Sequence, residues 1–513
     1  MSTYYITTPI YYVNAEPHLG HAYTTIAADV ASRHARQRGE DTFFLTGTDE
    51  HGAKVAQAAA AAGLEPKAWA DPIAERFRDL ARRLEASYDF FIRTTDPEHE
   101  AFVQQFVSAL RDRGHLFEGT YSGLYCTACE QFYREEELVD GRFCPQHGTE
   151  PEWTEEKNLF FRLSAFADEL LAHYDAHPDF ILPRGRMNET RAFVESGLED
   201  LSITRQGVSW GVPVPWDTSQ SIYVWVDALL NYASAPTYAR PGSDLSDRFW
   251  PPRWQVLGKD ILRFHAIIWP AMLMAAGYEL PRQLYIHGYL MGHDGHRMSK
   301  TRGNGMDPYP VMDTYGADAL RFYLLREVGF GQDGSVGYGT LHDRYHSELA
   351  NELGNLVNRS TAMIERYRGG VVPDAPVDAS IAAICDRVSA GFATRLDTLD
   401  FTGALDEAWE LVRALNRFVE ERAPWKLAKG EDAASADRLD ETLRTLADGI
   451  RVLGIVLHSV MPGTCERLLA AVGADPADLV WESAASGGLP AGARVDSSAA
   501  QLFPRIESPP VAA

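Results

Sequence analysis

The chain has 513 residues, of which 45% are hydrophobic and 23% are charged. This composition is typical of globular proteins and excludes the disordered, collagen-like and disulfide-scaffold classes. There are 48 Lys and Arg residues against 72 Asp and Glu residues, which gives a net charge of −24. A globally basic nucleic-acid binder is therefore excluded, and any nucleic acid must meet local basic or aromatic side chains.

The sequence also bears on the cellular compartment. The N-terminal residues lack the basic and apolar stretches of a secretory signal, and the longest apolar-rich run without charge, 267–278, is shorter than the ~20 residues that span a bilayer. Five cysteines, three of them at 126–144, indicate a reducing compartment and metal binding rather than disulfides. We therefore expect a cytoplasmic protein with no membrane partner.

The first part of the chain predicts a parallel sheet. A strand at 4–9, a helix at 17–38 and a strand at 42–47 form a βαβ unit with a right-handed crossover. A region rich in Cys, Tyr, Gly and Glu, 119–150, is typical of a small metal knuckle and separates this unit from later strand-like segments. The further predicted elements are helices at 52–62, 66–85, 97–113 and 158–200, and strands at 221–226, 254–257 and 283–290.

The second part of the chain predicts helices. A Gly-rich and polar loop spans 291–307, and the pattern from about 341 to 470 is that of an antiparallel bundle. Its predicted helices are 343–366, 377–397, 401–422, 436–460 and 463–472. The tail, 484–513, is rich in Ala, Gly, Pro and Ser, and we expect it to be loosely held.

These patterns predict an α/β fold: a Rossmann-like parallel sheet split by a zinc-knuckle insertion, followed by an all-α bundle. The predicted boundaries are 1–118 for the first half of the sheet domain, 119–200 for the insertion, 201–290 for the second half, 291–342 for the loop and linker, 343–483 for the bundle and 484–513 for the tail.

The first motif with chemical meaning is His18-Leu19-Gly20-His21, where the first strand leads into the first helix. Ligands of open parallel sheets bind beyond the carboxyl ends of the strands, and a helix N-terminus offers N–H groups to phosphate. A glycine between the histidines would let a flat base approach the backbone. The alternative for this motif alone is two surface histidines beside a packing glycine.

The second motif is Arg297-Met298-Ser299-Lys300-Thr301, which follows Gly292 and Gly295. Small residues around a lysine can form a mobile clamp for phosphate charge. Taken alone, the motif is better explained as a solvated basic loop. The pair of motifs resembles the HIGH and KMSKS signatures of the class I aminoacyl-tRNA synthetases, although Arg297 and Thr301 depart from the second signature.

Further segments narrow the resemblance to the methionyl-tRNA synthetases, over nearly the whole chain. They are Thr7 to Asn14, Asp49-Glu50-His51-Gly52, Tyr223 to Ala228, Gly258-Lys259-Asp260-Ile261 and Ile286-His287-Gly288-Tyr289. The resemblance implies an enzyme that converts L-methionine and ATP to methionyl-adenylate and then charges tRNA(Met). It implies that His18 and His21 hold the transition-state phosphate and that Lys300, with Arg297, neutralises the leaving pyrophosphate. Mg²⁺ would accompany ATP, whose other binding residues would be Gly20, Lys259, Asp260 and Ser299.

A methionine pocket fits the residue types. A thioether has no charge, so it is selected by shape, dispersion and contact between sulfur and aromatic rings. An anionic Asp49 at the end of a strand could pair with the substrate ammonium. The resemblance implies a pocket of Ile10, Tyr12, Asp49, Trp225, Ala228, Leu229, Tyr232 and His287, with Leu229 standing where many members have proline. Core packing is the alternative for each aromatic residue taken alone.

Two short pairs, Cys126 with Cys129 and Cys144 with His147, have the spacing of a structural zinc knuckle. We expect one structural Zn²⁺ per subunit; the alternative is three free cysteines near a histidine. In the bundle, the resemblance implies that Asn355, Arg359 and Trp481 read the anticodon, with capping and surface ion pairing as the alternative. The chain ends without an appended oligonucleotide-binding domain, and we therefore expect a monomer.

Two other classes of function remain open at this stage. A synthetase for isoleucine, valine or leucine would carry a larger editing insertion than 119–200, and a cysteinyl enzyme would place cysteines in the two sheet halves. A non-catalytic tRNA-binding module need not retain both phosphate motifs, whereas this chain has both.

Overall fold

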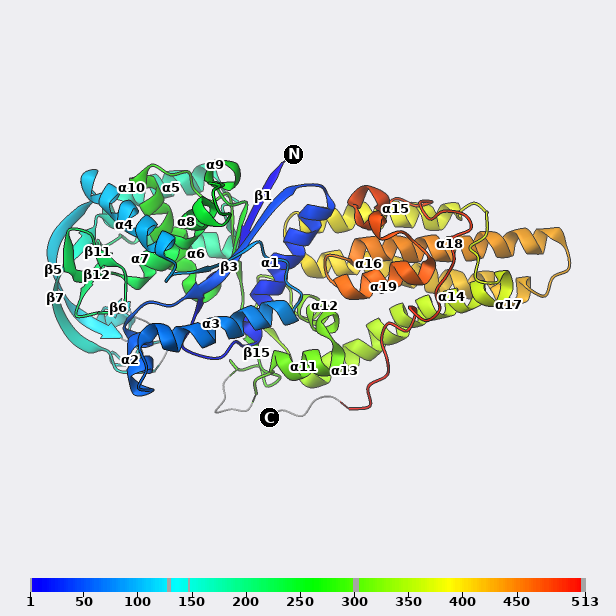
Figure 1. Ribbon diagram of the computed structural model, residues 1–513, viewed down its shortest axis with the longest axis horizontal. Coiled ribbons are helices and arrows are strands. Elements are labelled where there is room, and N and C mark those ends of the chain that lie inside the picture. The colour runs from blue at the N-terminus through cyan, green and yellow to red at the C-terminus, as the bar shows by residue number, and fades with distance from the viewer. Residues whose placement is uncertain (1, 127–130, 146–147, 299–303, 509–513) are drawn as a thin grey trace.

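A computed structural model of the chain describes residues 2–126, 131–145, 148–298 and 304–508. Figure 1 shows an elongated molecule with an α/β part at one end and a helical bundle at the other. The long helix α1 (Leu19–Gln37) lies between these two parts. Among the described residues, no helix is both long and apolar enough to cross a membrane.

A seven-stranded sheet, parallel in every pairing, organises the α/β part. The two halves of the chain meet where β1 pairs with β13, with Ile6 opposite Trp254. The predicted split parallel sheet is thus confirmed. Its strands, in spatial order, are β2 (Tyr11–Tyr12), β3 (Asp41–Asp49), β1 (Thr3–Thr7), β13 (Trp254–Gly258), β14 (Leu284–His287) and β8 (Ile181–Leu182), with β4 (Phe90–Arg93) also on β3.

Neighbouring residues of each strand enter two different cores, because successive side chains of a strand point to opposite faces. Ile6 and Phe44 pack with α1 in one core, whereas Tyr5 and Phe43 pack in the other. The remaining helices of this part are α2 (Ala53–Ala61), α3 (Pro66–Arg83), α4 (Pro97–Asp112), α7 (Val224–Leu229), α8 (Asn231–Tyr238), α9 (Ser246–Phe249) and α10 (Trp269–Ala276).

The insertion contains an antiparallel sheet rather than mainly helices. Its strands, in the order β6-β5-β7-β9, are β6 (Gln131–Tyr133), β5 (Leu116–Cys126), β7 (Glu152–Phe161) and β9 (Leu201–Ser202). Helices α5 (Ala167–Ala176) and α6 (Arg184–Glu195) flank β8, which pairs with β14 of the main sheet. The sheets therefore cross the predicted boundaries at 118 and 200.

Two element predictions in this part are wrong for one physical reason. A short apolar run fits a buried strand and a buried helix equally well. The start of 158–200 is the end of strand β7, and 224–226 begins helix α7. The predicted strand at 221–226 ends at Ile222, the last residue of β12 (Asp217–Ile222). In its small sheet, β12 lies between β10 (Thr204–Gln206) and β11 (Pro213–Val214).

The helical bundle is confirmed within a few residues at each end. A linker leads from the sheet domain into the bundle. It contains β15 (Leu290–Met291), α11 (Pro308–Tyr315), α12 (Ala317–Glu327) and β16 (Gly334–Ser335). Its helices are α13 (Tyr338–Arg344), a π-helical turn (Tyr345–Gly354), α14 (Asn355–Arg368), α15 (Ala379–Leu396), α16 (Phe401–Arg422), α17 (Pro424–Leu427), α18 (Ala433–Leu457) and α19 (Pro462–Val472).

A buried ion pair joins the bundle to the sheet domain. Asp29 of α1 and Arg321 of α12 meet at 2.7 Å with both side chains fully buried. The same guanidinium donates to the carbonyls of Ser459 and Val460, between α18 and α19. Because removing one partner of a buried pair leaves an uncompensated charge, this joint holds α1 and the bundle in one arrangement.

The prediction of a loosely held tail is wrong for its described part. Leu489 and Leu502 are buried, and the N–H of Val372 donates to the carbonyl of Ala493 at 2.8 Å. The Tyr345 hydroxyl donates to the carbonyl of Pro504 at 2.8 Å. A few apolar side chains and many backbone carbonyls are enough to hold a segment of this composition against the bundle.

Candidate active site

The two histidines of the first motif cap the N-terminus of α1. The Nδ1 atom of His18 accepts from the N–H of Gly20 at 3.1 Å, and the N–H of His18 donates to Nδ1 of His21 at 3.1 Å. The rings stack with centroids 3.7 Å apart. Since Nδ1 of each ring is an acceptor, the neutral ring carries its hydrogen on Nε2. Both histidines are thereby prepared as N–H donors.

The same two rings are neutral at ordinary pH. Burial lowers the pKa of His18, and burial together with the neighbouring His18 holds the pKa of His21 well below its usual range. A Cβ atom on Gly20 would lie 3.0 Å from Cε1 of His18, so glycine is needed for the ring to fold back onto the helix. The glycine therefore serves the histidine cap, a role that the sequence did not indicate.

Charged residues from the ends of other strands gather near His18. Asp260, just beyond β13, raises the pKa of His18 against the larger effect of burial, and Arg297 lowers it. The ring of Tyr289 contacts two cations, with Nζ of Lys259 at 4.1 Å and Cζ of Arg297 at 4.3 Å from its centroid. Lys259 also pairs with Asp333 at 2.6 Å. The predicted ATP residues Ser299 and Lys300 lie outside the described residues.

Several residues of the predicted methionine pocket share one apolar cluster on one face of the sheet. Leu229 and Tyr232 are buried in a single apolar cluster, against which Ile10, Tyr12 and Trp225 pack. Ala228 is buried on α7 beside them in sequence. The indole of Trp225 stacks on Phe264 with centroids 3.8 Å apart and meets the edge of Tyr12. These aromatic faces can bind an uncharged, polarizable side chain.

The structure places His287 elsewhere, which corrects its prediction as a pocket residue. Its Nε2 atom lies 2.8 Å from the hydroxyl of Thr24 in α1, and its ring packs against Tyr23 and Phe330. These rings belong to the core on the opposite face of the sheet. The side chains of β14 alternate between the two faces, and His287 falls on the wrong one.

His265 is the histidine that meets the pocket, and sequence analysis missed it. Its Nδ1–H donates to the carbonyl of Ile261 at 3.0 Å, so its Nε2 accepts from the hydroxyl of Tyr232 at 2.8 Å. Burial lowers the pKa of His265 to about 4, which keeps the ring neutral. The Phe264-His265 pair directly before the apolar run 267–278 is the signal that could have identified both residues.

Asp49 lies at the carboxyl end of β3, next to the pocket. The residue is 2% exposed and is paired in register with Tyr12 of β2. The N–H of Val13 donates to its carbonyl at 3.2 Å. A carboxylate at this edge, beside aromatic rings, can bind an ammonium group whose side chain enters the apolar cluster.

Two of the four predicted zinc ligands are in described positions. Cys126 and Cys144 are 2% and 1% exposed and share a small cluster with Tyr133 and Leu138. Cys129 and His147 lie outside the described residues. The described part of the chain holds no group of three or more His, Cys, Asp or Glu side chains that could bind a metal ion. A pair of thiols at the end of the β5–β6 hairpin therefore fits half of the predicted ligand set.

In the bundle, the predicted anticodon residues have different surroundings. Asn355 is exposed at the start of α14, and Arg359 pairs with Glu420 of α16 at 2.6 Å. Trp481 instead packs against His34 of α1 and Phe392 of α15, with centroid distances of 4.6 and 6.0 Å. The ion pair of Arg359 corresponds to the surface-pairing alternative, and Trp481 has a packing role instead.

Trp425 is an exposed tryptophan that sequence analysis did not single out. It follows the end of α16, which carries Glu420, and its side chain is 37% exposed. The Pro424-Trp425 pair directly after a long helix was the available signal, because proline starts a new turn and leaves the next side chain near the helix end.

The comparisons with known proteins agree with this geometry. The family model "tRNA synthetases class I (M)" matches residues 4–150 and 139–361. The methionine–tRNA ligases of Caldanaerobacter subterraneus subsp. tengcongensis and Streptomyces coelicolor are each 44% identical to the chain, over 98% and 99% of it and over 79% and 98% of their own lengths.

The structural comparison gives the same result. The methionyl-tRNA synthetase of Mycobacterium tuberculosis in complex with methionyl-adenylate superposes with a TM-score of 0.92 at 41% identity, covering 96% of this chain and 98% of that one. Identity at this level over nearly the whole length, together with the same fold, shows that the chain belongs to the methionyl class of the class I tRNA synthetases.

Proposed function

We propose that this methionine–tRNA ligase forms methionyl-adenylate at the carboxyl edge of its sheet and transfers the methionyl group to tRNA(Met). The observation that carries the proposal is the adjacency of two sites along this edge. A pair of neutral histidine donors caps α1, and a buried carboxylate next to an aromatic pocket ends β3. The first suits phosphate and the second an amino acid with an apolar side chain.

The first chemical step needs positioning and charge stabilisation more than covalent catalysis. The methionine carboxylate attacks the α-phosphorus of ATP, a carboxylate–phosphorus bond forms, and the bond to pyrophosphate breaks. Nε2–H groups of His18 and His21 would donate to the phosphate oxygens that gain charge. As donors held by the helix cap, they need no reorganisation when the charge develops.

The cationic residues would act on the leaving group. We assign Lys300, with Arg297 and Ser299, to the β- and γ-phosphates and Lys259 and Asp260 to the remainder of ATP. Mg²⁺, when bound with ATP, would supply charge neutralisation on the phosphates. In the second step the 3′-terminal ribose hydroxyl of tRNA attacks the methionyl carbonyl, and AMP leaves.

Methionine selection follows from the pocket. Asp49 would bind the ammonium group, while Tyr12, Trp225, Phe264 and Leu229 would surround the thioether. The Tyr232 hydroxyl gives its hydrogen to His265, so it does not offer that hydrogen to a polar substrate side chain. Rejection of polar amino acids then follows from the cost of burying a hydroxyl or charge without a partner. Ile10 and Ala228 would complete the wall.

We also assign a structural Zn²⁺ to the knuckle, with Cys126, Cys129, Cys144 and His147 as ligands. The burial of two thiols in one small cluster supports this donor set. Cys126→Ser should release zinc and loosen 119–150 while the parallel sheet stays folded. Metal analysis tests the first part, and circular dichroism with methionine-dependent exchange tests the second.

For tRNA, we assign the bundle to anticodon reading, with Asn355 and Arg359 on α14 and the exposed Trp425 as a stacking surface. Trp481 then joins the bundle to α1. We also assign the enzyme to the cytoplasm, where charged tRNA is used in translation. We propose a monomer, which size-exclusion chromatography with light scattering tests.

ATP–pyrophosphate exchange with each of the twenty amino acids is the direct test of the proposed function. Exchange that depends on methionine, with at most weak exchange for leucine, isoleucine and valine, is the expected result. Exchange that is stronger with another amino acid would contradict the pocket assignment. Exchange with none of them would contradict the assignment of the whole site.

A further inference from the structure

A fully buried carboxylate, Asp227, connects several elements around the proposed methionine pocket. It lies on α7 and accepts from Nδ1 of His51 at 2.7 Å and from Nε2 of His99 at 2.9 Å. The other ring nitrogen of His99 contacts the hydroxyl of Ser234 at 2.7 Å. The network therefore joins the end of β3 to α4, α7 and α8.

The network is held by charge as well as by hydrogen bonds. Burial alone lowers the pKa of His51, but the Asp227 carboxylate outweighs this effect and raises the pKa to about 10. The same interaction lowers the pKa of Asp227 against the opposing effect of burial. Glu100 is 3.6 Å from the other ring nitrogen of His51. Charge-assisted hydrogen bonds of this kind are shorter and stronger than neutral ones.

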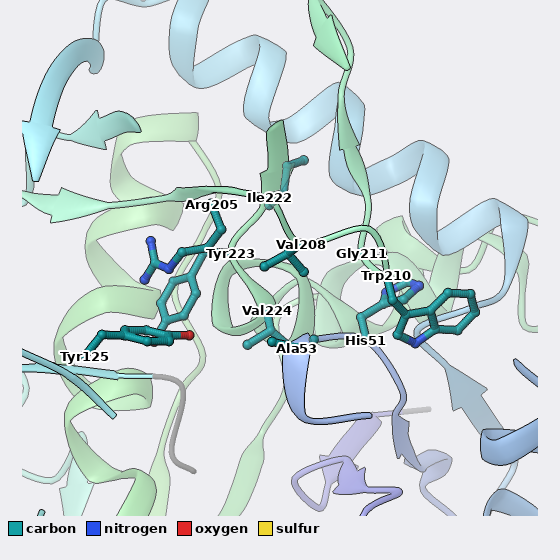
Figure 2. A pocket seen from close by; sticks show the side chains of 11 residues that line it. His51, Ala53, Tyr125, Arg205, Val208, Trp210, Gly211, Ile222, Tyr223 and Val224 are labelled. Atoms are coloured by element: carbon teal, nitrogen blue, oxygen red, sulfur yellow. The ribbon is translucent and has the colours of Figure 1, made fainter. Parts of the chain in front are cut away.

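The surroundings of His51 restrict it further. Figure 2 shows His51 beside Trp210 at one side of a small pocket, opposite Tyr125 and Arg205. The two rings meet edge to face at 5.2 Å, and the indole N–H of Trp210 donates to the carbonyl of Glu50 at 2.6 Å. The pocket is the place where the insertion and the sheet domain meet.

The residue between Asp49 and His51 is also fixed. Glu50 is fully buried and accepts a bidentate contact from Arg93 at 2.6 and 2.7 Å, together with the hydroxyl of Thr48 at 2.7 Å. Asp49 is thus followed directly by two residues, Glu50 and His51, whose side chains are each held by an ion pair. Its backbone has little freedom to move.

The positions of these residues in sequence connect the network to substrate binding. His51 is two residues after Asp49, the proposed ammonium anchor. Asp227 lies on α7 between Trp225 and Ala228, the proposed wall for the thioether. The hydrogen bond between His51 and Asp227 therefore links the two ends of the amino-acid site across the two halves of the sheet.

We propose that Asp227, with His51 and His99, is a positioning unit that sets the distance between the ammonium anchor and the side-chain wall, and so selects amino acids by side-chain length. The inference rests on the proposed function, because it assigns the selectivity of that same site. An uncharged side chain offers no directional contact, and one methylene changes binding only modestly, so length can be read only if both ends of the site are fixed.

The test compares variants that remove or keep the bonds to Asp227. Asp227→Asn keeps the shape but loses the charge, and His99→Leu removes one donor. His99→Gln retains a donor at the position of Nε2. As a matched control, Asp448→Asn removes a fully buried aspartate that pairs with Arg451 in the bundle. Exchange is measured with methionine and with its longer homologue ethionine, and KM is determined for methionine and for ATP.

Asp227→Asn should raise KM for methionine about tenfold with little change in KM for ATP, and it should lower the preference for methionine over ethionine. His99→Leu should do the same, and His99→Gln should stay within about threefold of the wild type. Asp448→Asn should lower thermal stability only. If Asp227→Asn fails to fold, the comparison of His99→Leu with His99→Gln tests the proposal.

Unchanged selectivity in Asp227→Asn or in His99→Leu would overturn the proposal. An equal effect of Asp448→Asn would also overturn it, because general destabilisation would then explain the result. Wild-type protein without methionine-dependent exchange would instead contradict the proposed function, so the two failures are distinguishable.

Discussion

The amino-acid side and the phosphate side of the candidate site differ in how their side chains are held. On the amino-acid side, Tyr232 and His265 are buried and bonded to each other, and Trp225 is stacked on Phe264. On the phosphate side, Arg297 is exposed and Lys259 pairs with the partly exposed Asp333. The two sides solve different physical problems.

Selection by shape needs walls that do not move, since a thioether offers no charge to orient it. Phosphate chemistry needs charge that follows the pyrophosphate as it leaves, and long cationic side chains can exchange partners at small cost near solvent. Substitutions on the phosphate side should therefore lower kcat, whereas substitutions on the amino-acid side should raise KM for methionine. The predictions that follow test this division.

The largest effect is expected for Lys300→Ala. A lysine that neutralises the leaving phosphates acts mainly in the transition state, so its loss should cost about 2–4 kcal/mol in kcat, by analogy with oxyanion contacts. KM for methionine should change little. Methionine-dependent exchange kinetics measure both constants, and a near wild-type rate would exclude the role of Lys300.

Substitution of His21 should have the second-largest effect on kcat, and the size of this effect should depend on the replacement. His21→Asn can keep the acceptor for the N–H of His18 but loses the donor at Nε2, and it should cost about 2–3 kcal/mol in kcat. His21→Gln places a donor near the lost position and should recover part of the rate. Equal rates for the two variants would mean that the ring only caps the helix.

The lowered pKa values of His18 and His21 predict a flat pH profile at neutral pH. A group with a lowered pKa stays neutral as the pH falls through its ordinary value, so kcat should show no titration of these rings at the ordinary histidine value. Protonation at lower pH would remove the Nδ1 acceptors and should then lower the rate. A loss of activity centred near pH 6.5 that His21→Gln abolishes would contradict the neutral pair.

On the amino-acid side, Tyr232→Phe should raise KM for methionine by about tenfold and leave kcat nearly unchanged. The substitution leaves the buried Nε2 of His265 without its donor, which costs roughly 1–3 kcal/mol. Tyr323→Phe, which removes the hydroxyl on α12 that contacts Thr340 of α13, is the control. A fall in kcat without a change in KM for Tyr232→Phe would contradict the assignment of KM effects to the amino-acid side.

The arrangement of the His18–His21 motif is easier to predict from sequence than the packing around Tyr232. The His18–His21 motif works through contacts within one helix turn, and local contacts leave a local pattern. The sheet was predictable because buried parallel strands are short apolar runs between turns. The pairing of Tyr232 with His265 rather than with His287 depends on which face of the sheet each reaches, and one sequence does not tell which face holds the pocket.

The bundle shows the same limit. Its helices follow from their apolar periodicity, but the choice between two tryptophans depends on tertiary packing. Trp481 lies far in sequence from α1 and α15, yet it is covered by His34 of the first and Phe392 of the second. Trp425 stays exposed because α16 ends just before it. The tail was mispredicted because composition does not show that its carbonyls meet Arg444 and Arg451.

The last prediction separates tRNA reading from adenylate formation and should leave exchange unchanged. Arg359→Ala should remove contacts to a base edge, at a cost of about 1–3 kcal/mol in aminoacylation, by analogy with DNA base contacts. Trp425→Ala should remove a stacking surface, at roughly 1–3 kcal/mol. Both residues lie in the bundle, away from the two sides of the site described above, so methionine-dependent exchange should remain normal.

Trp481→Ala is the decisive comparison for this assignment. Its ring packs on α1, the helix that carries His18 and His21, so its loss should lower thermal stability and reduce exchange and aminoacylation together. The ratio of aminoacylation to exchange, measured in one preparation, distinguishes the roles. A reduced ratio for Trp481→Ala with a normal ratio for Trp425→Ala would mean that Trp481, and not Trp425, reads the anticodon. If Arg359→Ala and Trp425→Ala both keep a normal ratio, the anticodon is read by other residues of the chain.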